Sequence, residues 1–403
     1  MSMNDFTRSE GAFTQQIIDI SRRRRQTALP VFIGYSARLE PYQLVNVHSF
    51  QHYRSFFSDS AVILPPEGYL ELCLRHYFDN GGTECFVISL GGGERSDNDF
   101  FDEKIYALID SEPAITLVAI PDMVLLAGEQ QRRLMERLGD FCASSMNVFA
   151  IVDLPADPTA AQALIDALDV NGADRMAGYW PWLITDYSEE NGQRSTDYHC
   201  IPPSGAVIAA IQRNDQERGI WKAPANIPLK RVIQPAYSHL TPVTLFHADP
   251  RDGASANLIR SFPGRGVLLW GCRTLKTSHD SHTLYIHSRR LASWLESELH
   301  YLVQPFVFEP NNEVTWYRIK ALIRRTLKEL WEQGGLQGGS EEEAYRILVG
   351  VGESMSEKDL DNGLLQIRVA VAILHPAEFI QISLDFYVNS VENATLDRNF
   401  PGT

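Results

Sequence analysis

The sequence predicts an α/β fold in which a mostly parallel sheet with flanking helices is followed by an α+β domain, with extended segments at both ends. Three observations predict it. Apolar runs alternate with stretches of helical spacing, two long amphipathic helices come next, and two strands with alternating apolar residues come near the end. Repeated alternation of strand and helix is typical of a parallel sheet covered on both faces. We expect four parts: residues 1–28, 29–275, 276–389 and 390–403.

The first element is a polar segment, residues 1–28, which has few apolar residues and is expected to form an extended N-terminal arm. Buried strands are predicted where nearly every residue is apolar. These runs are residues 29–34, 85–90, 114–120 and 147–152. Between them, apolar residues at helical spacing predict helices at residues 66–77, 129–141 and 158–168.

Segments rich in proline and glycine follow at residues 201–207, 215–226 and 261–271. Pro202 and Pro203 fix φ and remove backbone donors, and Gly219 permits a positive φ. We therefore expect rigid loops that join regular elements.

Two amphipathic helices are predicted at residues 288–303 and 313–332. Asn311 and Asn312 can cap the second helix, and Gly334 is a typical stop signal. Its apolar stripe comprises Trp316, Ile319, Ile323, Leu327 and Leu330. The opposite face holds Arg318, Arg325 and Lys328, flanked by Arg324, with Glu329 and Glu332 near its end. This basic face favours an acidic partner, although a solvated helix face is the commoner explanation.

Two strands, residues 364–374 and 379–389, have apolar residues at every second position, which predicts one buried face for each. Residues 375–378 connect them as a hairpin or a neighbouring strand pair. Strands near a terminus leave an edge that another chain can complete by β-augmentation. A second polar arm, residues 390–403, ends the sequence.

Charge and composition exclude several classes of function. The net charge of −15 opposes binding of nucleic acid by the body of the protein. The exception is the run Arg22, Arg23, Arg24 and Arg25, which favours an acidic partner or a solvated basic patch. No apolar stretch is long enough for a membrane span, and the start lacks the pattern of a secretory signal, so we expect cytoplasmic synthesis. The five scattered cysteines indicate reduced thiols rather than a disulfide frame or a metal site.

Candidate catalytic residues are few. Asp122 and Asp153 each follow a predicted strand, where they could act as general acid and base, ligate a metal or simply cap a turn. His199 and Ser204 lie beside Cys200, but a catalytic triad also needs an orienting acid. No nucleophile elbow, zinc-protease motif or nucleotide-binding loop occurs, and Gly91, Gly92 and Gly93 precede acidic residues and indicate a turn. The sequence assigns no catalytic, cofactor-binding or metal-ligating residue.

Several segments, taken in order, resemble the contractile-tail sheath family of contractile phage tails, R-type pyocins and extracellular contractile injection systems. These segments are residues 78–82 with 85–88, 201–205, 217–226, 261–266 with 270–275, 308–311 with Trp316, 330–331 through 336–338, and 376–379. The resemblance implies a domain of subtilisin-like topology without a working triad, followed by a C-terminal sheath domain. It also implies a structural protein and not an enzyme.

By the same resemblance, subunits form helically stacked rings around an inner tube, and contraction drives the tube through a target membrane. Partners would be further copies, related sheath paralogues, the inner tube protein, and baseplate or terminal cap proteins, without nucleic acid or membrane insertion. The resemblance implies that both arms add strands to neighbouring subunits and that the helix around Arg318 to Lys328 contacts the tube. The resemblance also implies that the protein, once synthesised in the cytoplasm, is assembled into a phage tail-like particle that can be released from the cell.

One departure from the family concerns the arm, where residues 10–13 replace a Pro-Gly-Val-Tyr motif and residues 21–25 are atypical. Together with the compact chain, it favours a specialised paralogue near the baseplate. Two alternatives remain at this point: an adaptor that never polymerises, and an α/β hydrolase-like enzyme that would use Asp122, Asp153, His199 or Ser204.

Overall fold

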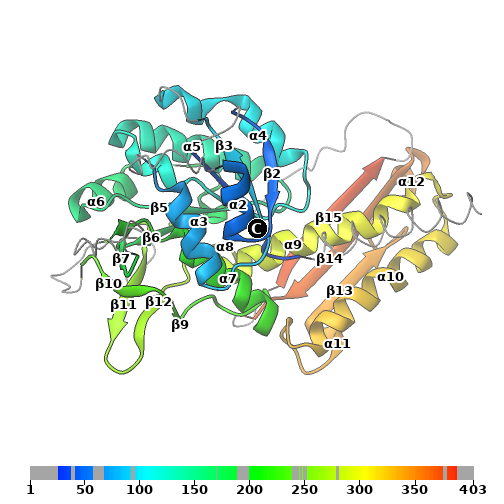
Figure 1. The fold of residues 1–403 in the computed structure, drawn as a ribbon. Helices are drawn as coiled ribbons and strands as arrows, with labels where there is room; N and C mark the ends of the chain where they lie inside the picture. The colour runs from blue at the N-terminus through cyan, green and yellow to red at the C-terminus, as the bar shows by residue number, and fades with distance from the viewer. Residues whose placement is uncertain are drawn as a thin grey trace, which may run out of the picture. The chain divides into compact units, whose positions relative to one another are not determined.

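The computed structural model describes residues 26–37, 41–57, 68–91, 96–168, 170–187, 199–237, 245, 247, 252–277, 281–374 and 379–387. Nearly all of both predicted arms, the arginine run and the connection at residues 375–378 therefore lie outside the described residues. The chain divides into two compact units, Met1–Arg290 and Leu291–Thr403 (Figure 1).

A nine-stranded sheet forms the centre of the first unit, in the order β2-β3-β1-β4-β5-β6-β11-β12-β9. The strands β3, β1, β4, β5, β6 and β11 run parallel, which confirms the predicted mostly parallel sheet. The antiparallel strands β2, β12 and β9 complete its edges. The bounds are β1 Pro30–Gly34, β2 Leu44–Val47, β3 Cys85–Ser89, β4 Leu117–Ala119, β5 Phe149–Asp153, β6 Met176–Trp180, β9 Ile227–Pro228, β11 Asn257–Phe262 and β12 Gly266–Trp270.

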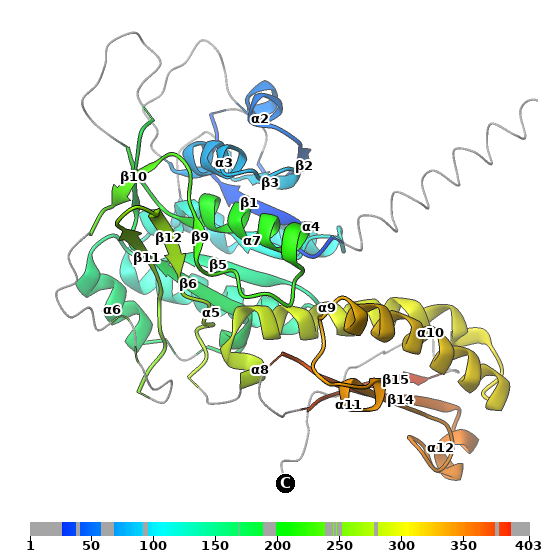
Figure 2. The same ribbon diagram turned by 90° about the horizontal axis from the view of Figure 1, so that it is seen from below.

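Helices cover both faces of this sheet, as predicted (Figure 2). In β1, Val31 and Ile33 belong to one apolar cluster with α4, α5 and α6, whereas Phe32 belongs to the other with α2, α3 and α7. Because both faces of such a strand are buried, its sequence is a continuous apolar run. The bounds are α2 Phe50–Phe57, α3 Leu70–Asp79, α4 Glu103–Asp110, α5 Gly128–Ser144, α6 Pro158–Asp166 and α7 Ser204–Arg218. A small antiparallel sheet comprises β7 Leu183–Thr185, β8 Cys200–Ile201 and β10 Val232–Pro235.

The expectation of rigid loops at residues 201–207 and 215–226 is wrong at residues 204–207 and 215–218, which belong to the 15-residue helix α7. Every residue from Ser204 to Gln212 is buried, so this part of the helix has no exposed face and shows no amphipathic stripe in the sequence. Pro203 precedes the first turn, a position that proline tolerates in helices. Residues 261–271 likewise form most of a hairpin, β11 and β12, rather than a loop.

The second unit contains the predicted long helix, α10 Glu313–Glu332. Asn312 Oδ1 accepts a hydrogen bond from Thr315 N at 3.1 Å, and Gly334 takes φ +76° after the last turn, so the predicted cap and stop are confirmed. Trp316, expected in the apolar stripe, is only half-buried and donates from its indole to Asn311 Oδ1. The preceding helix, α9 Ile286–Val303, begins in the first unit and continues into the second.

A three-stranded antiparallel sheet, in the order β13-β14-β15, accompanies α10. It comprises β13 Tyr345–Val349, β14 Leu364–Ala372 and β15 Phe379–Tyr387. The predicted strand pair is confirmed as an antiparallel ladder from Leu364 opposite Tyr387 to Ala372 opposite Phe379. Leu365, Ile367, Val369 and Val371 are buried and alternate with less buried residues. Among the described residues no strand pairs with the outer side of β15.

The close contact between α3 and α7 depends on Gly205, where an added Cβ would collide with the Cys73 carbonyl oxygen. We expect Gly205→Ala to destabilise the protein by about 2–3 kcal/mol, because the clashing atom is backbone and cannot rotate away. Gly128→Ala is the matched control, since a Cβ there meets nothing within 4 Å. Calorimetric unfolding should show a lower Tm for the first variant only, and equal Tm values for the two variants would contradict this packing.

Candidate interaction surfaces and buried polar groups

Asp122 lies in the 3₁₀ helix η2 (Pro121–Leu125) directly after β4 and is completely buried. Its carboxylate accepts hydrogen bonds from the backbone N–H groups of Tyr35, at 2.7 Å, and Tyr69. A Cβ on Gly34 would collide with Asp122 Oδ2, so this glycine allows the carboxylate to approach. Asp122 therefore fixes the chain after β1 to the chain before α3.

Asp153, at the end of β5, is also buried and its Oδ1 accepts a hydrogen bond from Ser204 N at 2.8 Å. Ser204 N belongs to the first turn of α7, where unpaired N–H groups favour a carboxylate. Burial raises the pKa of Asp153 to about 7, and the negative charge of Asp122 adds to the rise, whereas hydrogen bonding to Ser204 opposes it. The carboxylate thus joins β5 to the N-terminus of α7.

The structure places Asp122, Asp153 and Ser204 at the same rim of the sheet but does not assemble a triad. Ser204 Oγ is buried and has no hydrogen-bond partner among the described residues. His199 contributes its backbone carbonyl, which accepts hydrogen bonds from Thr185 N at 2.9 Å and Thr185 Oγ1 at 3.0 Å. A serine nucleophile needs a base bonded to its hydroxyl, so this geometry gives the hydrolase hypothesis no support.

A buried ion pair, absent from the sequence predictions, joins α7 to α9. The side chains of Arg290 and Asp215 are each 3% exposed, and they form two hydrogen bonds, of 2.7 and 3.2 Å. Thr27 completes the network, because its carbonyl accepts from Arg290 Nη2 at 2.8 Å and its hydroxyl donates to Asp215 Oδ2 at 2.7 Å. The three residues are remote in sequence, so no local pattern could have revealed the pair.

The predicted basic face of α10 is partly neutralised by acids of the same unit. Arg324 and Lys328 both pair with Glu341 of α11 (Glu341–Ala344), at 2.9 and 3.2 Å. Arg318 pairs with Glu309 at 3.4 Å, and its guanidinium lies 5.3 Å from the ring centroid of Phe306. Arg325 is exposed, and no ion pair is found for it among the described residues. Arg325 is therefore the better candidate for a contact outside the unit.

Exposed apolar side chains lie near the start of α10. Phe308, Val314 and Tyr317 are 91%, 67% and 72% exposed. Large apolar side chains this exposed often mark an interaction surface. The signal was present in the sequence, because Val314 and Tyr317 fall outside the apolar stripe of α10.

Among the described residues, no helix combines the length and apolar character needed to cross a bilayer. Nor do three or more His, Cys, Asp or Glu side chains come together there in a way that could hold a metal ion.

Comparison with known proteins assigns the family. Residues 278–386 match the family profile described as the phage tail sheath C-terminal domain. A chain in the cryo-EM structure of the anti-feeding prophage baseplate, in the contracted state, is 34% identical, with 89% of this chain and 93% of that chain covered and a TM-score of 0.76. The chain belongs to the phage tail sheath family. No curated protein is similar enough to match this sheath protein.

Two further structures resemble the sheath protein. A chain in the contracted helical sheath of the anti-feeding prophage is 31% identical, with coverage of 88% and 92% and a TM-score of 0.67. A chain in the contracted sheath complex of PVC, an extracellular contractile injection system, is 29% identical, with coverage of 88% and 90% and a TM-score of 0.69. The likeness extends over both units, so the mixed α/β architecture is shared with sheath structures.

The contributions of Asp215 and Arg290 to the stability of this sheath protein should depend strongly on each other. We expect Asp215→Ala to destabilise the protein by about 3–5 kcal/mol, because it leaves the Arg290 guanidinium buried without its partner. Combining it with Arg290→Met should restore part of that loss. Arg133→Ala, which breaks an exposed pair with Glu129, is the control and should cost less than about 1 kcal/mol. Additive losses in a double-mutant cycle of unfolding free energies would contradict the coupling.

Titration of Asp153 should make the folding stability of the protein fall as pH rises. Its pKa is about 7 in the folded protein and about 3.9 in the unfolded chain, so the unfolded chain loses its proton first as pH rises. Folding stability is therefore lost between about pH 4 and 7, by at most about 4 kcal/mol. Asp153→Asn keeps the acceptor for Ser204 N and removes the titration. Calorimetry should show the variant gaining stability over the wild type as pH rises, and a pH-independent difference would contradict the assignment.

Proposed function

We propose that this protein is a structural subunit of a contractile sheath, which polymerises as helically stacked rings around an inner tube. Contraction of the sheath then drives the tube through a target membrane. The observation that carries the proposal is the 31% identity to a chain of a contracted helical sheath over 88% of this chain. The protein acts by assembly and not as an enzyme. Its buried carboxylates support this role, because they bind backbone N–H groups inside the fold.

In this proposal residues 29–275 form a sheath domain of subtilisin-like topology and residues 276–389 form the C-terminal sheath domain. The terminal arms, residues 1–28 and 390–403, add strands to neighbouring subunits. The outer side of β15 supports this role, because no described strand of the same chain pairs with it. Exposed strand edges are a ready site for pairing with another chain.

The inner tube is the proposed partner of α10. Arg318 and Arg325 lie on its exposed side, with Val314 and Tyr317 close by in sequence, so the face offers both positive charge and apolar surface. Interfaces are typically enriched in arginine and aromatic residues. Further partners are copies of the chain, related sheath paralogues and baseplate or cap proteins, in a particle released from the cell.

A position near the baseplate is the more specific form of the proposal. The chain is 34% identical to a chain of the anti-feeding prophage baseplate structure and 31% identical to a chain of its helical sheath. A chain of a second baseplate structure is 29% identical, so this form of the proposal is supported by the 34% match alone, with its TM-score of 0.76 against 0.67 for the helical sheath.

Co-expression with the tube protein tests the proposal. We expect negative-stain electron microscopy to show tubular or ring-shaped assemblies with the full chain. Removal of residues 1–25, which keeps Thr27 and the buried Ala28, should abolish extended assemblies, because neighbouring subunits would lose their strand exchange. Arg133→Gln is the control and should assemble like the full chain, since it alters an exposed pair on α5. Absence of any assembly by the full chain, or normal assembly after truncation, would favour an adaptor that does not polymerise.

A further inference from the structure

A basic pocket of about 470 Å³ lies in the first unit, between α2, α3 and the turn before β10. Four of its lining residues are cationic, namely Arg54, Arg75, Lys230 and Arg231, and one, Asp79, is acidic. Such a concentration is unusual in a chain with a net charge of −15. Elements distant in sequence bring these side chains together, so the sequence alone gave no indication of the pocket.

Two of the guanidinium groups are held by the same aromatic ring. Arg75 lies 4.4 Å and Arg231 5.3 Å from the ring centroid of Tyr187. The Tyr187 hydroxyl donates to Asp79 Oδ2 at 2.7 Å, and Arg231 Nε lies 3.0 Å from Asp186 Oδ1. Tyr187 thus orients both Arg75 and Arg231, and Asp186 and Asp79 lie 3.0 and 3.9 Å from Arg231 Nε.

The turn that carries Arg231 is held in place by two buried side chains, those of His76 and Asn80. Asn80 Oδ1 accepts a hydrogen bond from Lys230 N at 2.7 Å, and the Lys230 carbonyl accepts from His76 Nε2 at 2.9 Å and from Asn80 Nδ2 at 3.2 Å. His76 and Asn80 are both completely buried. Burial lowers the pKa of His76 to about 4, so the ring stays neutral near pH 7. The backbone of Lys230 therefore has a single, well-defined position.

Arg231 adopts φ +60°, in the left-handed region that residues other than glycine and asparagine seldom occupy. Such strain persists where the surrounding structure enforces it, and it is found preferentially at ligand-binding and active sites. Here the bonds from His76 and Asn80 to Lys230 enforce it. The backbone thus holds an arginine at a position where glycine would be less strained.

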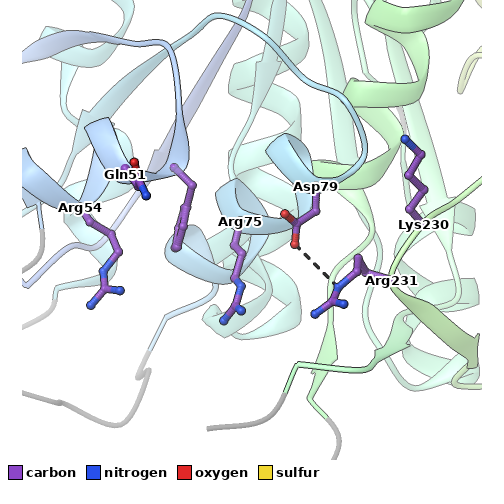
Figure 3. Close-up of a pocket in the computed structure, with 7 residues that line it drawn as sticks. Gln51, Arg54, Arg75, Asp79, Lys230 and Arg231 are labelled. Carbon is purple, nitrogen blue, oxygen red and sulfur yellow. Dashed lines mark ion pairs between the residues drawn. The ribbon is translucent and has the colours of Figure 1, made fainter. Parts of the chain in front are cut away.

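Figure 3 shows the guanidinium groups of Arg54, Arg75 and Arg231 in a row along the pocket, with Asp79 between the last two and the Lys230 ammonium pointing away. Guanidinium groups bind carboxylates and phosphates through paired hydrogen bonds. Groups arranged in a row suit an extended ligand with several acidic side chains better than one small anion.

We propose that this pocket binds an extended acidic segment of a second copy of the chain. Each copy carries 51 aspartate and glutamate residues against 36 lysine and arginine residues, so acidic surface is abundant on any neighbour. The inference rests on the proposed function, because a sheath subunit is surrounded by further copies of itself. The pocket would then contribute charge complementarity to the contact between subunits.

A binding experiment on the unassembled full chain tests the pocket directly. Fluorescence anisotropy would measure binding of a fluorescein-labelled hexaglutamate peptide in dilute buffer with little salt. We expect the triple variant Arg54→Gln, Arg75→Gln, Arg231→Asn to bind at least tenfold more weakly than the wild type. Asparagine is chosen at residue 231 because it tolerates a positive φ. The double variant Arg54→Gln, Arg75→Gln, which leaves the turn intact, should weaken binding at least threefold.

The control triple variant is Lys104→Gln, Arg133→Gln, Arg265→Gln, which removes the same charge from exposed positions outside the pocket. It should change the peptide affinity less than twofold. Equal weakening by the two triple variants, or no binding by the wild type, would overturn the proposal. Inorganic phosphate is the competitor, and displacement of the peptide at equal concentrations of phosphate and peptide would indicate a small-anion site instead.

Assembly with the tube protein separates this inference from the proposed function. We expect the pocket triple variant to need at least a threefold higher subunit concentration than the control triple variant to form tubular assemblies. Equal assembly of the two variants would refute a second copy as the occupant and leave the sheath function standing. Failure of the wild type to assemble under any condition would instead refute the sheath function, while the peptide measurement would still report on the pocket.

Discussion

The buried ion pair between Arg290 and Asp215 is the interaction on which much of the first unit depends. Removing two charges from water costs several kcal/mol per ion, and the cost is offset only when nearly every donor and acceptor is satisfied. Here Arg290 bonds to both carboxylate oxygens and to the Thr27 carbonyl, and the Thr27 hydroxyl bonds to Asp215. The network fixes three segments at once: the chain just before β1, the buried helix α7 and the first turn of α9. All three segments belong to the first unit, so the pair acts within that unit.

A second constraint is the use of buried carboxylates as structural groups. Asp122 and Asp153 lie at the rim where open α/β sheets usually bind ligands. In this protein they accept hydrogen bonds from the backbone N–H groups of Tyr35, Tyr69 and Ser204. These bonds join the chain after β1, β4 and β5 to the starts of α3 and α7, so this rim of the sheet contributes to the rigidity of the first unit.

The parts of the fold that the sequence predicted are those with a local signal. The strands β1, β3, β4 and β5 are continuous apolar runs because both faces are covered, and α10 has an apolar stripe between Asn312 and Gly334. Helix α7 was missed because its residues from Ser204 to Gln212 are all buried, and their apolar side chains therefore have no helical periodicity. The ion pair and the basic pocket could not be predicted, because each combines residues from segments far apart in the chain. Of the predicted basic face, Arg324 and Lys328 are paired with Glu341, a contact that only the tertiary structure reveals.

Hydrogen exchange measured by mass spectrometry on the wild type and Asp215→Asn tests the central claim most directly, because this substitution removes the charge and almost no volume. If the ion pair joins the three segments, Asp215→Asn should lower the protection from hydrogen exchange in residues 27–34, in α7 and in the first turn of α9 alike. Protection in α5 should change little. Loss of protection confined to α7, or none at all, would contradict the claim that this single buried pair holds the three segments together.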